Sequence, residues 1–286
     1  MKLSIITINR NNAAGLRNTM ESVFSQSYHD FEYIVVDGAS TDGSVDVIKE
    51  FAERAIADKQ SPAAFTWLSE SDTGIYNAMN KGCKMAKGEF TLMLNSADTL
   101  VDAFVIEKML PELQTVDMIQ GNIIVENGNG KYRNKSYAQS NISFFDVLDM
   151  QFLHQAIFIR RDILKQYGYY DESYKLSSDS YFFITALGFG NATYKYVNID
   201  IANFDMNGIS GTRNPEMQKI GEDECTRWFK EHVSNRLMEM YRTAPKKIRL
   251  YDTLHSHKLV WYITMGLIRM AERLAPSPKN QRIEKI

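Results

Sequence analysis

Two apolar runs in this chain end abruptly in carboxylates. Residues 33–36 lead into Asp37, and residues 92–94 are followed within four positions by Asp98. In an open α/β sheet, ligands bind just beyond the carboxyl ends of the strands. Two carboxylates delivered to that edge predict a site for a nucleoside and for a metal-bound diphosphate, which is the chemistry of sugar transfer from a nucleotide donor.

The loop at residues 37–43 does not fit a phosphate-binding role, because its acidic side chains would repel phosphate. The sequence contains neither GxGxxG nor GxxxxGK[ST], which disfavours a dehydrogenase or a P-loop enzyme. A carboxylate at a strand end instead accepts hydrogen bonds from a uracil N–H or a ribose hydroxyl. The alternative is that Asp37 and Asp42 only shape the turn and cap the following helix.

Alternating strand and helix patterns position these carboxylates. The strands expected in the first hundred residues span 3–8, 33–36, 65–68 and 89–94. Segments with helical spacing separate them, so the chain is expected to be an α/β protein with a mostly parallel central sheet and helices on both faces. The second half is less regular, with strands expected at 118–125, 156–159 and 193–197.

The composition is ordinary for a soluble globular protein, with 44% hydrophobic and 24% charged residues. A formal net charge of −2 argues against a nucleic-acid-binding protein. Cys83 and Cys225 form neither a zinc-ligand pattern nor a disulfide framework, so reduced thiols and a cytoplasmic location are expected. The N-terminus lacks a signal-peptide pattern, and no apolar run reaches the roughly 20 residues that span a bilayer.

The charge balance changes near Pro245. Residues 245–286 contain nine Lys or Arg and three Asp or Glu, and their apolar residues recur at helical spacing. We therefore expect one domain at 1–244, with a nucleotide-binding half at about 1–100 and an acceptor half at about 101–244, followed by a helical extension at 245–286. A basic amphipathic helix packs on its own protein, on a second copy in a homo-oligomer, or on an anionic membrane surface.

The motifs together resemble the family 2 glycosyltransferases of bacterial polysaccharide synthesis, which have the GT-A fold. The matching segments occur in the family's order at residues 4–11, 35–44, 69–82, 94–98 and 154–155. The resemblance implies an inverting enzyme that transfers a hexosyl or N-acetylhexosaminyl group. The donor would be a nucleotide sugar, with UDP-sugars as the expected class. The acceptor would be a glycan or a lipid-linked oligosaccharide.

The resemblance also implies roles for individual residues. Asp37 would contact uracil or ribose, and Asp72 would approach the nucleoside from the end of the third strand. Donor-sugar or acceptor binding is implied for His154 and Gln155, and the loop at 207–211, with Ser210, resembles a lid over the donor, although it reads equally as an ordinary turn. The residues expected to line the nucleotide pocket at the end of the first strand are Thr7, Asn9 and Arg10.

Asp98 matches the last carboxylate of the family's metal-binding motif, but Ser96 stands where the first acid is usual. Mn²⁺ or Mg²⁺ remains the expected cofactor, because phosphates and waters supply most of its oxygen ligands. Ser96 is then expected to belong to the donor-sugar or acceptor site. Because Ser96 replaces the usual acid, the alternative remains open that this chain is a relative with weak or no metal dependence.

The helix expected at 75–87 has an apolar stripe and a polar face. Asn80 and Lys81 lie toward the nucleotide edge, where Lys81 offsets diphosphate charge or is simply a solvated side chain. Inverting transfer also needs a carboxylate to take the acceptor proton. The resemblance places that base at Asp179, which would also suit an N-cap, while Asp171 is the competing carboxylate with a turn role.

Two rival functions remain open from the sequence. A sugar nucleotidyltransferase would have a related sheet, but residues 9–12 lack the glycine-rich phosphate loop expected of one. A non-catalytic nucleotide- or glycan-binding relative is favoured only by the missing acid at Ser96, and the presence of both Asp98 and Asp179 argues against it.

Overall fold

A computed structural model describes residues 1–58, 61–114, 116–127, 130–134, 140, 142, 144–149, 152–205 and 214–234. The chain divides into two compact units, Met1–Glu231 and His232–Ile286. The second unit lies almost wholly outside the described residues, and so does the boundary expected at Pro245. The division of the chain at residue 244 therefore stays a prediction.

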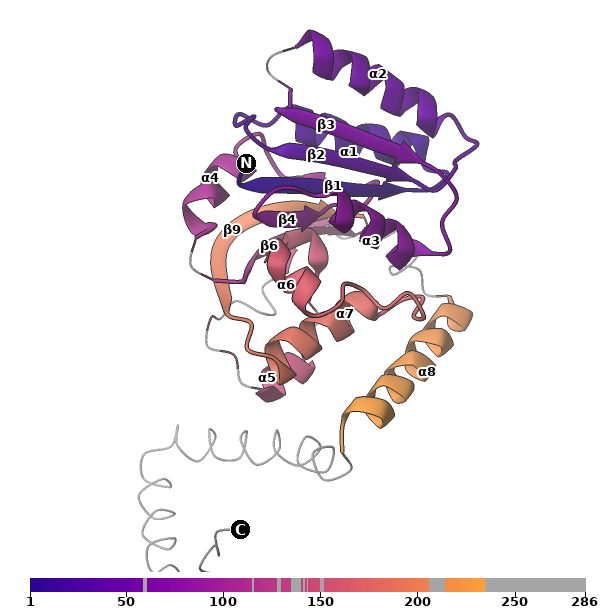
Figure 1. The fold of residues 1–286 in the computed structure, drawn as a ribbon, viewed down its shortest axis with the longest axis vertical. Helices are drawn as coiled ribbons and strands as arrows, with labels where there is room; N and C mark the ends of the chain where they lie inside the picture. The colour runs from indigo at the N-terminus through magenta and orange to yellow at the C-terminus, as the bar shows by residue number, and fades with distance from the viewer. Residues whose placement is uncertain are drawn as a thin grey trace, which may run out of the picture. The chain divides into compact units, whose positions relative to one another are not determined.

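One sheet runs through the first unit (Figure 1). Its strands are β1 (Leu3–Asn9), β2 (Glu32–Asp37), β3 (Ala64–Ser69), β4 (Phe90–Met93), β5 (Thr99–Leu100), β6 (Met118–Asn127), β7 (Gly130–Asn134), β8 (Ile157–Arg160) and β9 (Tyr194–Phe204). Within the described residues their order is β3-β2-β1-β4-β8-β6-β9-β5, with β7 paired to β6.

The two halves of the sheet differ in strand direction. Strands β3, β2, β1 and β4 are all parallel, as the alternating strand and helix pattern predicts. Beyond β4, strand β8 pairs antiparallel to both β4 and β6, and β9 returns parallel to β6. Strand β5 closes the far edge antiparallel to β9, with Thr99 opposite Asn203, which brings the end of β9 beside the residues that follow β4.

The helices are α1 (Ala13–Phe24), α2 (Ser44–Ala57), α3 (Ile75–Met85), α4 (Val105–Met109), α5 (Phe144–Asp149), α6 (Arg161–Gln166), α7 (Ser178–Phe183) and α8 (Pro215–His232). Short helical turns lie at η1 (Leu110–Glu112), η2 (His154–Ala156) and η3 (Ile184–Phe189), the last being a π-helix that continues α7. Figure 1 shows α1 behind the parallel strands and α3 in front of them.

Strands β1, β2 and β4 are buried on both faces, so their side chains alternate between two layers. Ile5, Tyr33 and Val35 belong to one core cluster with Leu16 and Phe24 of α1. On the opposite face α3 approaches closely, because a Cβ on Gly82 would lie 2.3 Å from the Ile6 side chain. A glycine in the middle of a helix costs stability, and this contact with the sheet is its reason here.

The predicted fold class is confirmed: the protein is α/β, with a mostly parallel, curled central sheet and helices on both faces. No helix in the described part of the chain is long and apolar enough to cross a membrane.

Candidate functional site

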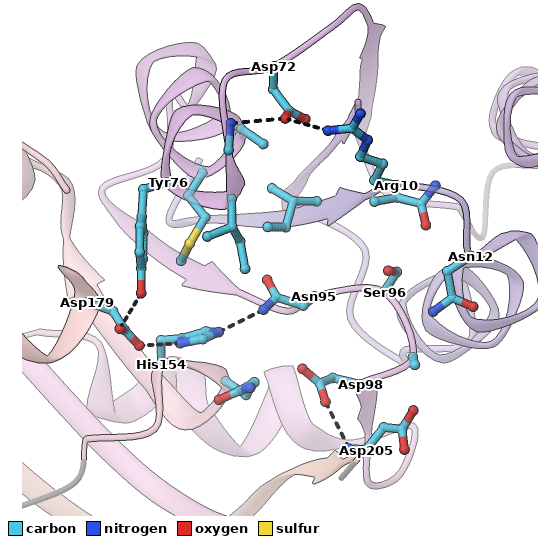
Figure 2. Close-up of a pocket in the computed structure, with 18 of the residues that line it drawn as sticks. Arg10, Asn12, Asp72, Tyr76, Asn95, Ser96, Asp98, His154, Asp179 and Asp205 are labelled. Atoms are coloured by element: carbon cyan, nitrogen blue, oxygen red, sulfur yellow. Dashed lines mark hydrogen bonds and ion pairs between the residues drawn. The ribbon is translucent and has the colours of Figure 1, made fainter. Parts of the chain in front are cut away.

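A cavity of about 710 Å³ lies at the carboxyl ends of the parallel strands. Both halves of the sheet contribute to its walls (Figure 2). From the first half come the residues after β1, the start of α3, and the turn after β4; from the second come η2, the start of α7, and the end of β9. The polar side chains that line it include Asn9, Arg10, Asp72, Asn95, Ser96, Asp98, His154, Gln155, Asp179 and Asp205.

Asp37 is not among the lining residues, because it is completely buried beneath the cavity floor. Its carboxylate accepts hydrogen bonds from Asn9 Nδ2 at 2.8 Å, the Ser40 backbone N–H at 2.9 Å and Ser69 Oγ at 2.7 Å, and from the Ser40 hydroxyl. Burial alone would raise the pKa of Asp37, but these bonds together lower it. The carboxylate is thus an ionised anchor for the ends of β1, β2 and β3.

Arg10 and Asp72 form one wall of the cavity. Arg10 Nη1 lies 3.6 Å from Asp72 Oδ1, which also accepts a hydrogen bond from the backbone N–H of Gly74 at the start of α3. Asp72 reaches this place because residue 38 has no side chain: a Cβ there would lie 2.3 Å from Asp72 Oδ2. The glycine that follows Asp37 therefore makes room for the second carboxylate of the predicted nucleoside site.

The turn at residues 95–98 carries the third carboxylate. The backbone of Ser96 donates to the Ile8 carbonyl, and Thr19 Oγ1 donates to the Asp98 carbonyl at 2.7 Å. Between them Ala97 has a φ of 82°, a left-handed conformation that is strained for alanine and that occurs chiefly at functional sites. The strained turn brings Ser96 and Asp98 to the cavity wall.

Asp98 has the strongest electrostatic perturbation among the lining carboxylates. It is only 4% exposed, and burial raises its pKa to about 6 even though the Asp205 backbone N–H and the Gln155 side chain donate to it. The negative charge of Asp205 adds to the rise. A carboxylate with few donors and a like charge nearby is one that a bound cation would stabilise.

The expected cofactor, Mn²⁺ or Mg²⁺, prefers hard oxygen ligands and is commonly held by one or two carboxylates together with substrate phosphates. Asp98 supplies a carboxylate to the cavity. Gln155, also in the cavity wall, has an amide oxygen that is buried without a hydrogen-bond partner in the described part of the protein. This donor set fits such an ion, but no group of three acidic, histidine or cysteine side chains among the described residues could hold a metal unaided.

Asp179 faces the cavity from the first turn of α7 and is held by two side chains. Tyr76 Oη donates to Asp179 Oδ1 at 2.9 Å, and His154 Nδ1 lies 2.8 Å from Asp179 Oδ2. Burial, followed by the charge of Asp179, raises the pKa of Tyr76, so its hydroxyl keeps its proton and remains a donor. Both contacts hold the Asp179 carboxylate in place at the cavity wall.

Helix α8 supports the segment that leads into Asp179. The buried carboxylate of Glu224 accepts from the backbone N–H groups of Lys175 and Leu176. The Trp228 ring stacks on Tyr181 of α7 at 5.2 Å between centroids, with an interplanar angle of 7°. These contacts fix the start of α7.

Besides Asp37, three of the predicted site residues that the structure describes do not line the cavity. Thr7 is fully buried and accepts from Tyr33 Oη. Asn80 Nδ2 donates to the Tyr170 carbonyl and to Glu172, and Lys81 Nζ contacts Glu70 and the Ser71 carbonyl. These side chains brace the surrounding loops, and nothing in their contacts supports nucleotide binding. Ser210 lies outside the described residues.

The sequence reasoning missed several residues of the cavity wall. Tyr76 belongs to a buried stripe of α3 with Met79, Asn80 and Cys83. The spacing of this stripe is visible in the sequence. Asn95 lies within the motif at residues 94–98, but the sequence analysis predicts no role for it. Asp205 had no local signal, because only the pairing of β5 with β9 brings it beside Asp98.

Comparisons with known proteins identify the family of the chain. The model of the family described as Glycosyl transferase family 2 matches residues 4–168. A PGL/p-HBAD biosynthesis glycosyltransferase of Mycobacterium bovis is 29% identical over 73% of this chain and 79% of its own length. An uncharacterized glycosyltransferase of Mycobacterium tuberculosis is 30% identical over 77% of this chain and 83% of its own length.

Solved structures share the fold. TarS of S. aureus in complex with UDP-GlcNAc has a TM-score of 0.60 and 19% identity, covering 71% of this chain and 58% of that chain. The mannosyltransferase PcManGT of Pyrobaculum calidifontis, in complex with GDP-Man and Mn²⁺, has a TM-score of 0.60 and 16% identity, covering 81% of this chain and 64% of that chain.

Proposed function

The chain belongs to glycosyl transferase family 2 and is a glycosyltransferase, and we propose that it is an inverting enzyme that uses a UDP-sugar. The proposal places the donor between Asp72 and Asp98 and the acceptor hydroxyl at Asp179. One observation carries it: the carboxylate at Asp179 lines the same cavity as Asp72 and Asp98, so a base and a donor site share one space.

The nucleoside side of the cavity is proposed at Asn9, Arg10 and Asp72. Asp72 accepts hydrogen bonds from ribose or the base, and Arg10, whose side chain is 64% exposed, is available to the donor as well as to Asp72. Asp37 then acts from below by holding Asn9 in place. Its direct contact with the nucleoside stays a prediction, because protein donors surround both of its oxygens.

The reaction step is a direct displacement at the anomeric carbon. Asp179 takes the proton from the acceptor hydroxyl as its oxygen forms the new glycosidic bond, while the bond to the diphosphate breaks and the electron pair leaves with the nucleoside diphosphate. Tyr76 and His154 hold the carboxylate in place for this transfer. General bases of this kind contribute roughly 10²- to 10⁴-fold to the rate.

Asp98 is the residue we propose to hold Mn²⁺ or Mg²⁺, with the Gln155 amide oxygen nearby. When bound, such an ion stabilises negative charge on the departing diphosphate. Ser96, on the same turn, is proposed to contact the donor sugar or the acceptor. The complex of PcManGT with GDP-Man and Mn²⁺ supports divalent metal use in this fold.

The acceptor and the surroundings of the enzyme are proposed more broadly. A glycan or lipid-linked oligosaccharide of a bacterial surface polysaccharide fits the family. The proposed location is the cytoplasm. Residues 245–286 are proposed to contact either the inner face of the membrane or a second copy of the chain. That extension lies outside the described residues, so liposome binding by the intact chain is the direct test.

The proposal is tested by Asp179→Asn. The amide keeps the shape of the side chain but cannot take a proton, so UDP release from UDP-sugars in the presence of an acceptor should fall roughly 10²- to 10⁴-fold. Calorimetric UDP affinity should be unchanged. Asp171→Asn is the matched control, because Asp171 is exposed and its carboxylate accepts a hydrogen bond from the backbone N–H of Ser173.

Unchanged turnover in Asp179→Asn would remove Asp179 as the base. If the wild-type chain binds UDP but releases none from any UDP-sugar or GDP-sugar in a broad panel of donors and acceptors, the non-catalytic alternative gains support.

A further inference from the structure

Four side chains form a continuous hydrogen-bonded chain across the cavity (Figure 2). Asn95 Nδ2 lies 3.0 Å from His154 Nε2, His154 Nδ1 lies 2.8 Å from Asp179 Oδ2, and Tyr76 Oη donates to Asp179 Oδ1 at 2.9 Å. The four come from the turn after β4, from η2, from α7 and from α3. The chain therefore joins the turn that carries Asp98 to the proposed base.

The contacts on the two sides of the ring agree on where the proton of a neutral His154 lies. An amide NH₂ group only donates, so the ring nitrogen that faces it, Nε2, must be the acceptor. The ring proton is then on Nδ1, which faces Asp179 Oδ2. In histidine, the hydrogen bond made by one nitrogen sets the protonation of the other.

This tautomer suits a base. With Nδ1–H and the Tyr76 hydroxyl donating, the Asp179 side chain is held in place and each of its oxygens keeps a lone pair for the acceptor proton. With the proton on Nε2 instead, the lone pair of Nδ1 would face the carboxylate and repel it. This repulsion would displace Asp179 from its position and impair proton transfer.

The orientation of the Asn95 amide rests on this contact. Its oxygen, Oδ1, is buried and has no partner in the described part of the protein, so no second bond from that end holds the amide in its orientation. A reversed amide would place Oδ1 against Nε2, which could bond to it only if Nε2 carried a proton. An aspartate at position 95 would place a carboxylate oxygen against Nε2 and so favour a proton on that nitrogen.

We infer that Asn95 is a positioning residue that acts together with Asp179 to hold His154 in the Nδ1–H tautomer, so that an N–H group stays directed at Asp179. The inference rests on the proposed role of Asp179 as the base, but the tautomer itself is measurable without any reaction. If this inference holds, the turn at 95–98 positions both the proposed metal-binding carboxylate, Asp98, and the proposed base, Asp179.

The test is the protonation of the His154 ring nitrogens in the full chain. Long-range ¹H–¹⁵N correlation spectra of ¹⁵N-histidine-labelled protein distinguish bare from protonated ring nitrogens, and the chain has only five histidines. His154→Gln assigns the signal. We expect a protonated Nδ1 and a bare Nε2 in the wild type, and a protonated Nε2 in Asn95→Asp. Asn198→Asp, on the exposed part of β9, should leave the His154 signals unchanged.

A wild-type His154 with a bare Nδ1, or with both nitrogens protonated, would overturn the inference, and this result needs no variant to fold. An unchanged Nε2 in a folded Asn95→Asp would overturn it as well. Failure of the proposed function looks different: full turnover in Asp179→Asn would remove the base while leaving the tautomer of His154 as described.

Discussion

The ends of β2 and β4 each deliver a buried aspartate to the same edge of the sheet, yet the two carboxylates have opposite surroundings. Asp37 is fully buried and accepts from three neighbouring side chains and a backbone N–H, so its pKa is lowered. Asp98 receives a backbone N–H and one side-chain donor, and burial raises its pKa to about 6. Only Asp98 lines the cavity.

A strand-end carboxylate therefore takes its role from the donors around it. Where serine and asparagine side chains converge, as at Asp37, their hydrogen bonds stabilise the charge, and the carboxylate serves to join strands. Where few donors reach a buried carboxylate, as at Asp98, the charge remains poorly stabilised and is available to a cation. Three measurements test this contrast between Asp37 and Asp98.

The largest effect is expected for Asp37→Asn. An asparagine can accept through only one oxygen, and its NH₂ group would face donors. About two charge-assisted hydrogen bonds would be lost, each worth about 2 kcal/mol, so the free energy of unfolding should fall by about 4 kcal/mol in denaturant titrations near pH 7. A change within 1 kcal/mol would show that Asp37 is not an anchor.

The opposite sign is expected for Asp98→Asn. A folded-state pKa raised from the ordinary value of 3.8 to about 6 means that the ionised carboxylate destabilises the native protein. At about 1.4 kcal/mol per pKa unit, the neutral amide should raise the free energy of unfolding at pH 7.5 by up to about 3 kcal/mol. The measurement is urea unfolding without divalent metal.

The pH dependence of the free energy of unfolding shows whether the stability gained in Asp98→Asn comes from removing the charge. Because the folded-state pKa of Asp98 is raised, the native wild type binds its proton more readily than the unfolded chain does, and this contribution to stability is lost as pH rises through about 6. The advantage of Asp98→Asn should therefore shrink as pH falls from about 7 and vanish near pH 4. A difference independent of pH would point to packing instead of charge.

Most of the fold could be predicted from the sequence, because local patterns determine it. The parallel strands appear as β-branched runs such as residues 33–36, and α3 ends close to where its spacing and Gly88 indicate. The mixed half depends on long-range pairing, and residues 99–100 are too short a strand to leave a pattern. Their pairing with β9 is nevertheless what places Asp205 at the cavity.

The site was predictable in part, for the same physical reason. Motif residues that leave a strand end, such as Asp72 and Asp98, reach the cavity as expected. The sequence does not show whether such a side chain is saturated by neighbours, and so Asp37 and Lys81 could not be separated from the lining residues. The contact between Tyr76 and Asp179 joins residues 103 positions apart, which no local pattern reveals.

The smallest of the three effects concerns metal-assisted binding. If Asp98 holds the ion, Mn²⁺ should tighten UDP binding to the wild type relative to a chelator, and Asp98→Asn should lose a factor of about ten in that gain, or about 1.4 kcal/mol. Isothermal titration calorimetry of UDP with and without Mn²⁺ measures this directly, and it requires no knowledge of donor sugar or acceptor.

Asp37→Asn, measured at a temperature where it is folded, completes the contrast. Because Asp37 is enclosed by protein donors, its replacement should leave the gain from Mn²⁺ intact even if UDP binding weakens through a displaced Asn9. An equal gain in Asp98→Asn and in the wild type would remove Asp98 as a ligand. Loss of the gain in Asp37→Asn alone would instead place the cation near the end of β2 and reverse the roles of the two carboxylates.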